Sequence, residues 1–184
     1  MKEGIRIIGL DDGPFTFQSK TTPVVGVIIR VPTYIEGIIR FEVTVDGTDA
    51  TEKVISNLKN SRFIEQLRLI LVDGIAFGGF NNLDIVKIYN ELSIPVLTLT
   101  RDKPDFDKIE KALKKKFKDW EQRWTVITKQ PVKSIKIKNY TIYGAGVGID
   151  EKEILKILEK TTIRGAIPEP LRIAHLVATA MSKI

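Results

Sequence analysis

The chain has 184 residues, of which 43% are hydrophobic and 28% charged, a composition typical of one soluble globular domain covering residues 1–184. It contains no cysteine, which excludes disulfides, zinc–thiolate sites and thiol nucleophiles. No apolar run reaches membrane-spanning length and no secretory signal opens the chain, so we expect a cytoplasmic protein.

The formal net charge of +6 is unevenly distributed along the chain. Residues 1–100 carry 10 basic and 12 acidic side chains (net −2), and residues 101–184 carry 19 and 11 (net +8). Segregated positive charge indicates an anionic partner such as nucleic acid. The alternative is a lysine-rich surface that only promotes solubility.

The first predicted strand covers residues 5–13 (IRIIGLDDG) and ends in two acids, Asp11 and Asp12. Gly13 and Pro14 then stop the strand. Residues 24–31 (VVGVIIRV) predict a second strand. Residues 38–45 alternate between apolar and polar side chains, which predicts a third strand with one solvated face and leaves residues 34–37 as the connection.

A helix is predicted over residues 50–58, where apolar residues share one stripe, and Asp49 lies at its start. Asp49 can have one of two roles: the N-cap of this helix or a carboxylate of a functional site. Residues 67–80 (LRLILVDGIAFGGF) contain an unbroken aliphatic run that ends at Asp73 before a glycine-rich turn. Such a run predicts a strand buried on both faces in the middle of a partly parallel sheet.

Asp11 and Asp73 therefore both end central strands, where open α/β sheets bind their ligands. If the strands are neighbours, the two carboxylates repel each other unless a cation lies between them. Hard oxygen ligands favour Mg²⁺ or Mn²⁺ over zinc. The alternative for Asp73 is that it only caps the following turn.

The next helix should run from Asn81 or Asn82 to residue 92, and residues 94–99 should form a strand parallel to the one that ends at Asp73. Residues 105–120 predict one amphipathic helix with a lysine-rich, solvated face. Residues 134–143 predict a strand interrupted at residues 138–139 by a bulge or a tight turn. Residues 150–160 predict a short helix.

The last helix is predicted from Leu171 towards residue 183 and carries the only histidine. A polar stripe with helical spacing runs along it, formed by Arg172, His175, Thr179 and Ser182. On a helix that is otherwise apolar, this stripe faces either solvent or a polar cleft.

Several stretches resemble a known enzyme family: IIGLDDG in the first strand, LILVDG at Asp73, the IPVLTL strand, and TIRGAIPEPLRIAHL near the end. On these residues the chain resembles endonuclease V and, more closely, an uncharacterised, mainly archaeal family grouped with that enzyme. The resemblance implies a ribonuclease H-like α/β fold, a mixed sheet flanked by helices. It also implies metal ligands at Asp11, Asp73 and Asp49, with His175 as a further catalytic residue.

Asp12 and Asp46 are alternatives to Asp11 and Asp49 in this site. The implied function is a nuclease or phosphodiesterase that uses Mg²⁺ or Mn²⁺ on nucleic acid, without the base-recognition residues of endonuclease V. We expect residues 78–80 (GGF) to form a flexible loop suited to single-stranded or loosened substrates. The alternatives are a catalytically silent nucleic-acid-binding or assembly protein, and a hydrolase of a small phosphorylated metabolite.

Overall fold

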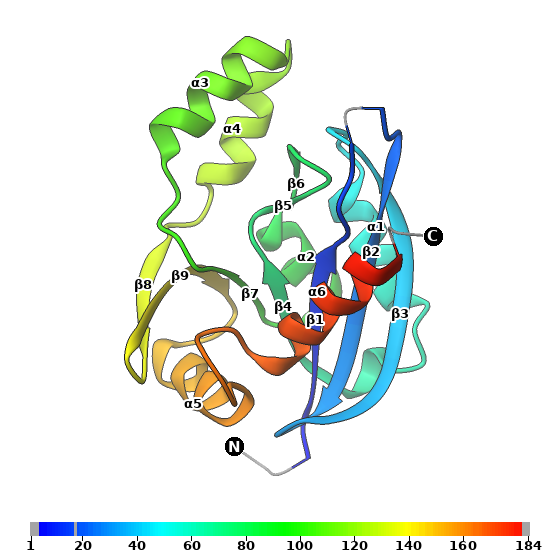
Figure 1. Ribbon diagram of the computed structural model, residues 1–184, viewed down its shortest axis with the longest axis vertical. Helices are drawn as coiled ribbons and strands as arrows, with labels where there is room; N and C mark the ends of the chain where they lie inside the picture. The colour runs from blue at the N-terminus through cyan, green and yellow to red at the C-terminus, as the bar shows by residue number, and fades with distance from the viewer. Residues whose placement is uncertain (1–3, 17, 182–184) are drawn as a thin grey trace.

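The computed structural model describes residues 4–16 and 18–181 and shows a twisted sheet with helices on both faces (Figure 1). Its elements, in chain order, are β1 (Arg6–Asp12), β2 (Thr21–Arg30), β3 (Tyr34–Thr44), α1 (Ala50–Lys59), a 3₁₀ turn (Ile64–Gln66), β4 (Leu67–Asp73), β5 (Ala76–Phe77), β6 (Asn81–Asn82), α2 (Ile85–Leu92), β7 (Val96–Thr100), α3 (Phe106–Lys116), α4 (Trp120–Thr128), β8 (Lys133–Ile137), β9 (Tyr140–Val147), α5 (Glu151–Thr161) and α6 (Glu169–Met181). Among these helices, none has both the length and the apolar character needed to cross a membrane.

One seven-stranded mixed sheet has the strand order β3-β2-β1-β4-β7-β9-β8, and β5 and β6 form a separate small ribbon. The central strands β1, β4 and β7 are parallel, whereas β2, β3, β9 and β8 pair in antiparallel fashion. Residues 69–72 are fully buried, as expected for a strand covered on both faces. The predicted mixed sheet is therefore observed, with the Asp73 strand at its centre.

Side chains of the central strands alternate between two apolar cores. Ile8 packs on the side of α1 and α2, whereas Ile7 packs on the side of α5 and α6. In β4, Leu71 also belongs to the core under α6. Because side chains alternate along a strand, Asp11 lies on the same face of the sheet as Ile7, and Asp73 lies on the same face as Leu71. Both aspartates therefore face α6.

Helix α6 lies directly on the backbone of β1 (Figure 1). A Cβ atom at Gly9 would be 2.5 Å from the carbonyl carbon of Pro170 and 2.7 Å from the amide nitrogen of Leu171, so only glycine permits this approach. One helical turn from Leu171 to His175 rises about 6 Å, and two strand residues from Gly9 to Asp11 span about 6.6 Å. Because the helix and the strand advance by nearly the same distance from their contact at Gly9, His175 lies next to Asp11.

The structure corrects one prediction about the strands and decides between two alternatives for another. Residues 34–37 are not a connection but the first part of β3, where Tyr34 pairs with Arg30 and Gly37 pairs with Ile28. This pairing satisfies the outer backbone groups of β2 up to its last residue. At residues 138–139 the chain makes a tight turn rather than a bulge, with Lys138 at a φ of 53°.

The single helix predicted over residues 105–120 is wrong, because the chain breaks at Phe117 into α3 and α4. Phe117 is extended, and its ring packs edge-to-face against Phe80 with a centroid distance of 5.6 Å. The guanidinium of Arg123 lies over the same ring at 4.1 Å. Since the apolar spacing continues through the break, periodicity alone could not reveal it. The result is a helical hairpin projecting from the sheet (Figure 1).

The helix predicted to start at Asn81 or Asn82 also starts later. The two asparagines form β6, and α2 begins at Ile85 with Asp84 as its N-cap. The Asp84 carboxylate accepts a hydrogen bond from the amide of Lys87 at 3.0 Å, which satisfies one free amide of the first turn.

The contact at Gly9 predicts a specific cost for Gly9→Ala. Its new methyl group would clash with the backbone of α6, so we expect the free energy of unfolding to fall by about 1–3 kcal/mol. Gly146→Ala, also within a strand, is the matched control, because its Cβ would meet only side-chain atoms at 3.3–3.5 Å. Urea denaturation of both variants tests this, and equal losses would show that the close approach does not constrain the helix.

Candidate active site

Asp11 and Asp73 lie side by side at the carboxyl ends of two central strands. β1 and β4 are adjacent and parallel, and Leu10 pairs with Val72 immediately before the two aspartates. Both side chains lie on the face of the sheet that is covered by α6. The sheet therefore places two carboxylates together, as the sequence predicted, at the edge where α/β sheets bind ligands.

Asp11 is the most buried of these acids, with 5% of its surface exposed. Its carboxylate accepts a 2.9 Å hydrogen bond from the amide of Asp12 and contacts Nδ1 of His175 at 2.8 Å. Burial, followed by the negative charge of Asp73, raises the pKa of Asp11 to about 7, although the hydrogen bond with His175 acts in the opposite direction. The folded protein therefore holds this negative charge at a cost.

Asp73 is partly buried, and burial likewise raises its pKa, while the positive charges of His175 and Arg101 oppose the increase. Its side chain accepts no hydrogen bond within residues 4–16 and 18–181. Arg101 directly follows β7, the strand next to β4. Asp73 is thus a desolvated carboxylate whose lone pairs are open to a ligand.

Asp12 also belongs to this edge of the sheet. Burial raises the pKa of Asp12, and the charge of Asp73 adds to the increase. Its carboxylate accepts a 2.8 Å hydrogen bond from the amide of Gly78, which ties the loop after β4 to the end of β1. Asp12 therefore has a structural partner but contributes negative charge next to Asp11 and Asp73.

His175 lies beside Asp11, where the sequence placed it, yet 63% of its side chain is exposed. Its Nδ1 contacts Asp11, so the other ring nitrogen is available to solvent or substrate. Arg172, on the same stripe, forms a two-point ion pair with the buried Glu169 in the first turn of α6. Ser182, the last member of the predicted stripe, lies outside the described residues.

Asp49, the third ligand in the predicted three-aspartate arrangement, makes no hydrogen bond or ion pair with Asp11, Asp73 or His175 within residues 4–16 and 18–181. It precedes α1 as its N-cap but makes no side-chain capping bond. Its carboxylate instead accepts hydrogen bonds from the amide and hydroxyl of Thr44 and from the side chain of Asn81. These bonds outweigh desolvation and lower the pKa of Asp49. Its charge is therefore satisfied by Thr44 and Asn81.

Asp46 also has other partners. Its carboxylate accepts a 3.1 Å hydrogen bond from the amide of Phe80 and forms an ion pair with Lys116 of α3. It adopts a φ of 55°, and its amide donates to the carbonyl of Gly78 at 2.7 Å. Asp46 therefore links the turn after β3 to the loop after β4.

The loop at residues 78–80 is held in place, which contradicts the flexible loop expected from its glycines. Phe77, just before it, is fully buried, and Gly78 is bonded through both its amide and its carbonyl. Phe80 packs against Phe117, and Lys116 lies over its ring at 5.8 Å. Because the Phe80 ring is already used in this packing, it does not form a free stacking platform.

The donor set at the edge of the sheet suits a hard divalent cation only in part. Within the part of the chain that the structure describes, no three histidine or acidic side chains come together as a ready-made metal cage. Asp11 and Asp73 nevertheless provide two desolvated carboxylates that repel each other. Mg²⁺ commonly binds through one or two carboxylates, with water and substrate phosphate completing its coordination. The residues present fit that mode of binding.

Comparison with known proteins agrees with this architecture. The family model described as endonuclease dU matches residues 3–182. A UPF0215 protein of Methanosarcina mazei is 45% identical over 185 residues, covering 99% of this chain and 93% of that protein. The crystal structure of an Archaeoglobus fulgidus protein of unknown function is 35% identical, with a TM-score of 0.86, and the alignment covers 96% of this chain and 98% of that one.

The fold extends to more distant proteins. Endonuclease V of Ciona intestinalis, crystallised with a 24mer DNA containing an inosine followed by a ribo-adenosine, superposes with a TM-score of 0.67 and 13% identity. The alignment covers 98% of this chain and 87% of that one. At this identity the likeness concerns the fold alone, and it confirms the predicted ribonuclease H-like class.

The opposite environments of Asp11 and Asp49 predict opposite effects of removing their charges. With metal removed, Asp11→Asn should raise the free energy of unfolding at pH 8 by roughly 1–3 kcal/mol, since one unit of pKa corresponds to about 1.4 kcal/mol. The reason is that a raised folded-state pKa makes the ionised form destabilising as pH increases from about 4 to about 7.

Asp49→Asn should lower stability at the same pH, because a lowered folded-state pKa means that its ionised form stabilises the fold. Thermal and urea denaturation in a chelating buffer measure both variants. A destabilised Asp11→Asn protein would show that the buried carboxylate is needed for the fold itself.

Proposed function

Because the chain belongs to the endonuclease dU family, we propose that it is a metal-dependent endonuclease whose active site, formed by Asp11, Asp73 and His175, cleaves the backbone of nucleic acid. The observation that carries the proposal is the 2.8 Å contact between Asp11 and His175, which are 164 positions apart. A histidine held by a carboxylate next to a second, unbonded carboxylate is suited to proton transfer at a phosphodiester.

Asp11 and Asp73 would hold a Mg²⁺ or Mn²⁺ ion, and Asp12 would add to the negative charge that attracts it. When bound, such a cation supplies positive charge next to a phosphate and favours ionisation of a bound water. The protein's own contribution is to keep the two carboxylates desolvated and close together, which the parallel pairing of β1 and β4 ensures.

His175 would transfer the proton. An ionised Asp11 accepts a hydrogen bond from Nδ1–H of His175, which fixes this tautomer and leaves Nε2 as an acceptor. Nε2 can then take a proton from an attacking water or, once charged, give it to the leaving oxygen. Arg101, whose positive charge opposes the increase in the pKa of Asp73, would bind a non-bridging phosphate oxygen.

The substrate proposed is single-stranded or locally loosened nucleic acid. A protein that acts beside a paired base has to extrude it, at a cost of a few kcal/mol. The residues after Asp73 are engaged in contacts with Asp12, Asp46 and Phe117, so this loop offers no free wedge for opening a duplex. We therefore propose that the protein cleaves strands containing hypoxanthine no faster than strands of normal bases. Because the family is described as endonuclease dU, deoxyuridine is the second modified nucleotide to test.

The central prediction is that Asp73→Asn abolishes cleavage in a folded protein. With Mn²⁺ or Mg²⁺ and end-labelled DNA or RNA, we expect the cleavage rate to fall by roughly 100-fold or more, as for removal of one electrostatic group from an active site. Asp49→Asn is the matched control and should keep cutting, because Asp49 is bonded only within its own turn and to Asn81.

The substrates in this assay are single strands, matched duplexes and the same duplexes with one hypoxanthine or deoxyuridine. Single strands should be cut faster than perfect duplexes. Circular dichroism confirms that each variant is folded. Cleavage by Asp73→Asn at the rate of the unmodified protein would refute the proposed site, and binding without any cleavage would identify a silent nucleic-acid-binding protein.

A second prediction concerns the helical hairpin formed by α3 and α4. Lys111 and Lys115 lie one turn apart on α3, and Lys118 lies in the connection between α3 and α4. All three are exposed and form no ion pair in the described residues. We expect them to contact phosphates, each adding roughly 0.7–0.9 to the slope of log affinity against log salt. Replacing all three by glutamine should lower that slope by about 2, measured by fluorescence anisotropy at several salt concentrations. An unchanged slope would show that this face is only solvated.

A further inference from the structure

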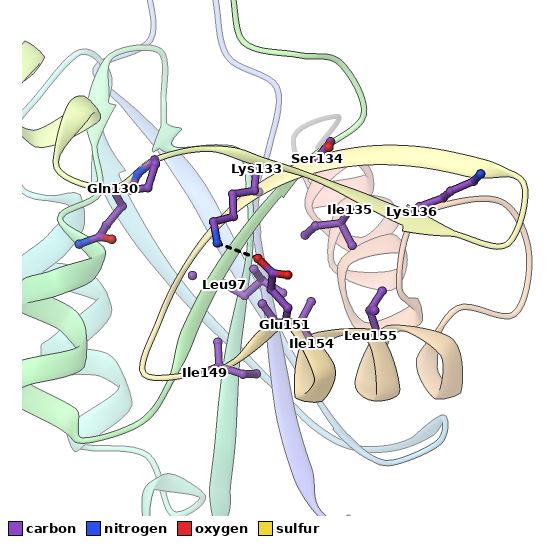
Figure 2. Close-up of a pocket in the computed structure, with 13 residues that line it drawn as sticks. Leu97, Gln130, Lys133, Ser134, Ile135, Lys136, Ile149, Glu151, Ile154 and Leu155 are labelled. Carbon is purple, nitrogen blue, oxygen red and sulfur yellow. Dashed lines mark hydrogen bonds and ion pairs between the residues drawn. The ribbon is translucent and has the colours of Figure 1, made fainter.

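A cavity of about 320 Å³ lies between the β8–β9 hairpin and helix α5 (Figure 2). Its walls are largely aliphatic and include Leu97 of β7, Ile135 of β8, and Ile149, Ile154 and Leu155 from the start of α5. Figure 2 shows the ion pair between Lys133 and Glu151 reaching across it, from β8 to α5. The volume is that of a small-ligand site.

Two glycines of β9 leave this space open. Gly144 and Gly146 both line the cavity. A Cβ at Gly146 would meet Ile149, Ile154 and Leu97 at 3.3–3.5 Å, so a larger side chain there would project into the same space. Gly146 is exposed whereas Gly144 is buried, so the space beside Gly146 forms a slot between aliphatic side chains that suits a flat ring.

The cavity lies on the same face of the sheet as the proposed active site. Leu97 and Leu99 belong to the apolar core under α5 and α6, as do the residues that lead to Asp73. Across the sheet, Asp73 pairs with Leu99, and Leu99 pairs with Gly144. Two strand spacings of about 4.8 Å separate Asp73 from Gly144, or about 10 Å in total, a gap that a short length of single strand can bridge.

The rim of the cavity is polar and can be rearranged. The side chain of Gln130 makes no hydrogen bond within the described residues, so it can bond to the edge of a ligand. The ion pair between Lys133 and Glu151 is largely exposed, at 63% and 74%, and is therefore weak enough to open. Lys133, once released, can approach a phosphate at the entrance.

We propose that this cavity binds an unpaired nucleobase of the substrate strand, and thereby positions the neighbouring phosphodiester at Asp11 and Asp73. The inference rests on the proposed nuclease function and extends it to how the substrate is held. A slot with aliphatic walls and a lysine at its entrance matches a base joined to its phosphate, since the walls cover the faces of the ring and Lys133 binds the backbone.

The test is to fill the cavity with Leu155→Trp, at a position that is 37% exposed and so tolerates a larger side chain. Gly146→Leu fills the cavity from β9, because a side chain at this position projects towards Ile149, Ile154 and Leu97. Ile38→Trp is the matched control, because Ile38 is an exposed apolar residue on β3, at the far edge of the sheet. Thermal denaturation checks that each variant is folded. Each is then assayed on a single-stranded oligonucleotide and on the same oligonucleotide with abasic sites at every position near the cut.

On the normal strand, we expect either cavity variant to reduce kcat/KM by about 10-fold to 200-fold, the range for the loss of one apolar contact in a binding pocket. Ile38→Trp should match the unmodified protein. On the abasic strand, all four proteins should be equally slow, because no base is present to bind. Undiminished cutting by both cavity variants, or equal cutting of normal and abasic strands by the unmodified protein, would overturn the assignment while leaving the nuclease proposal intact. A complete absence of cutting by the unmodified protein would instead overturn the proposed function.

Discussion

The close contact between Gly9 and the first turn of α6 is the constraint on which the candidate site depends. It allows the last helix to lie on the backbone of the first strand, so that His175 reaches Asp11. Ala174 and Ala178 are fully buried on the same helix, and their small side chains keep the helix close along its length. The end of the first strand and the last helix therefore meet at the point where the central strands end.

The acids of this protein fall into two groups that differ in how their charge is stabilised. Asp46 and Asp49 accept hydrogen bonds from nearby backbone and side-chain donors, and they organise the turn between β3 and α1. At the end of the sheet, burial raises the pKa values of Asp11 and Asp73, and the negative charge of Asp73 adds to the increase at Asp11. Satisfied carboxylates build structure, whereas desolvated and crowded ones are typical of sites that bind cations or transfer protons.

The loop after β4 connects this acidic edge to the helical hairpin. Arg123 of α4 is buried and donates to the carbonyls of Gly47 and Phe80 at 2.9 and 2.7 Å. Phe80 in turn packs against Phe117 at the break between α3 and α4. Because these contacts hold the hairpin to the body of the protein, its lysines have a defined position relative to the edge of the sheet.

Local patterns determined most of the fold. Unbroken aliphatic runs identified the central strands, and the acids at their ends identified Asp11 and Asp73 as neighbours. These predictions succeeded because strand burial and the placement of strand ends depend on residues close together in the chain. The resemblance over residues 162–176 placed His175 near Asp11, and the structure shows this contact.

Only the tertiary structure decided the contacts that join distant residues. The carboxylate of Asp49 accepts a hydrogen bond from Asn81, 32 positions away. The helix over residues 105–120 breaks because Phe117 packs against Phe80, and its apolar spacing gives no sign of this. The glycines in residues 78–80 suggested mobility, yet Asp12 and Asp46 hold the loop. In each case a side chain from another strand or turn supplied the deciding hydrogen bond or packing surface, and local periodicity carries no information about such partners.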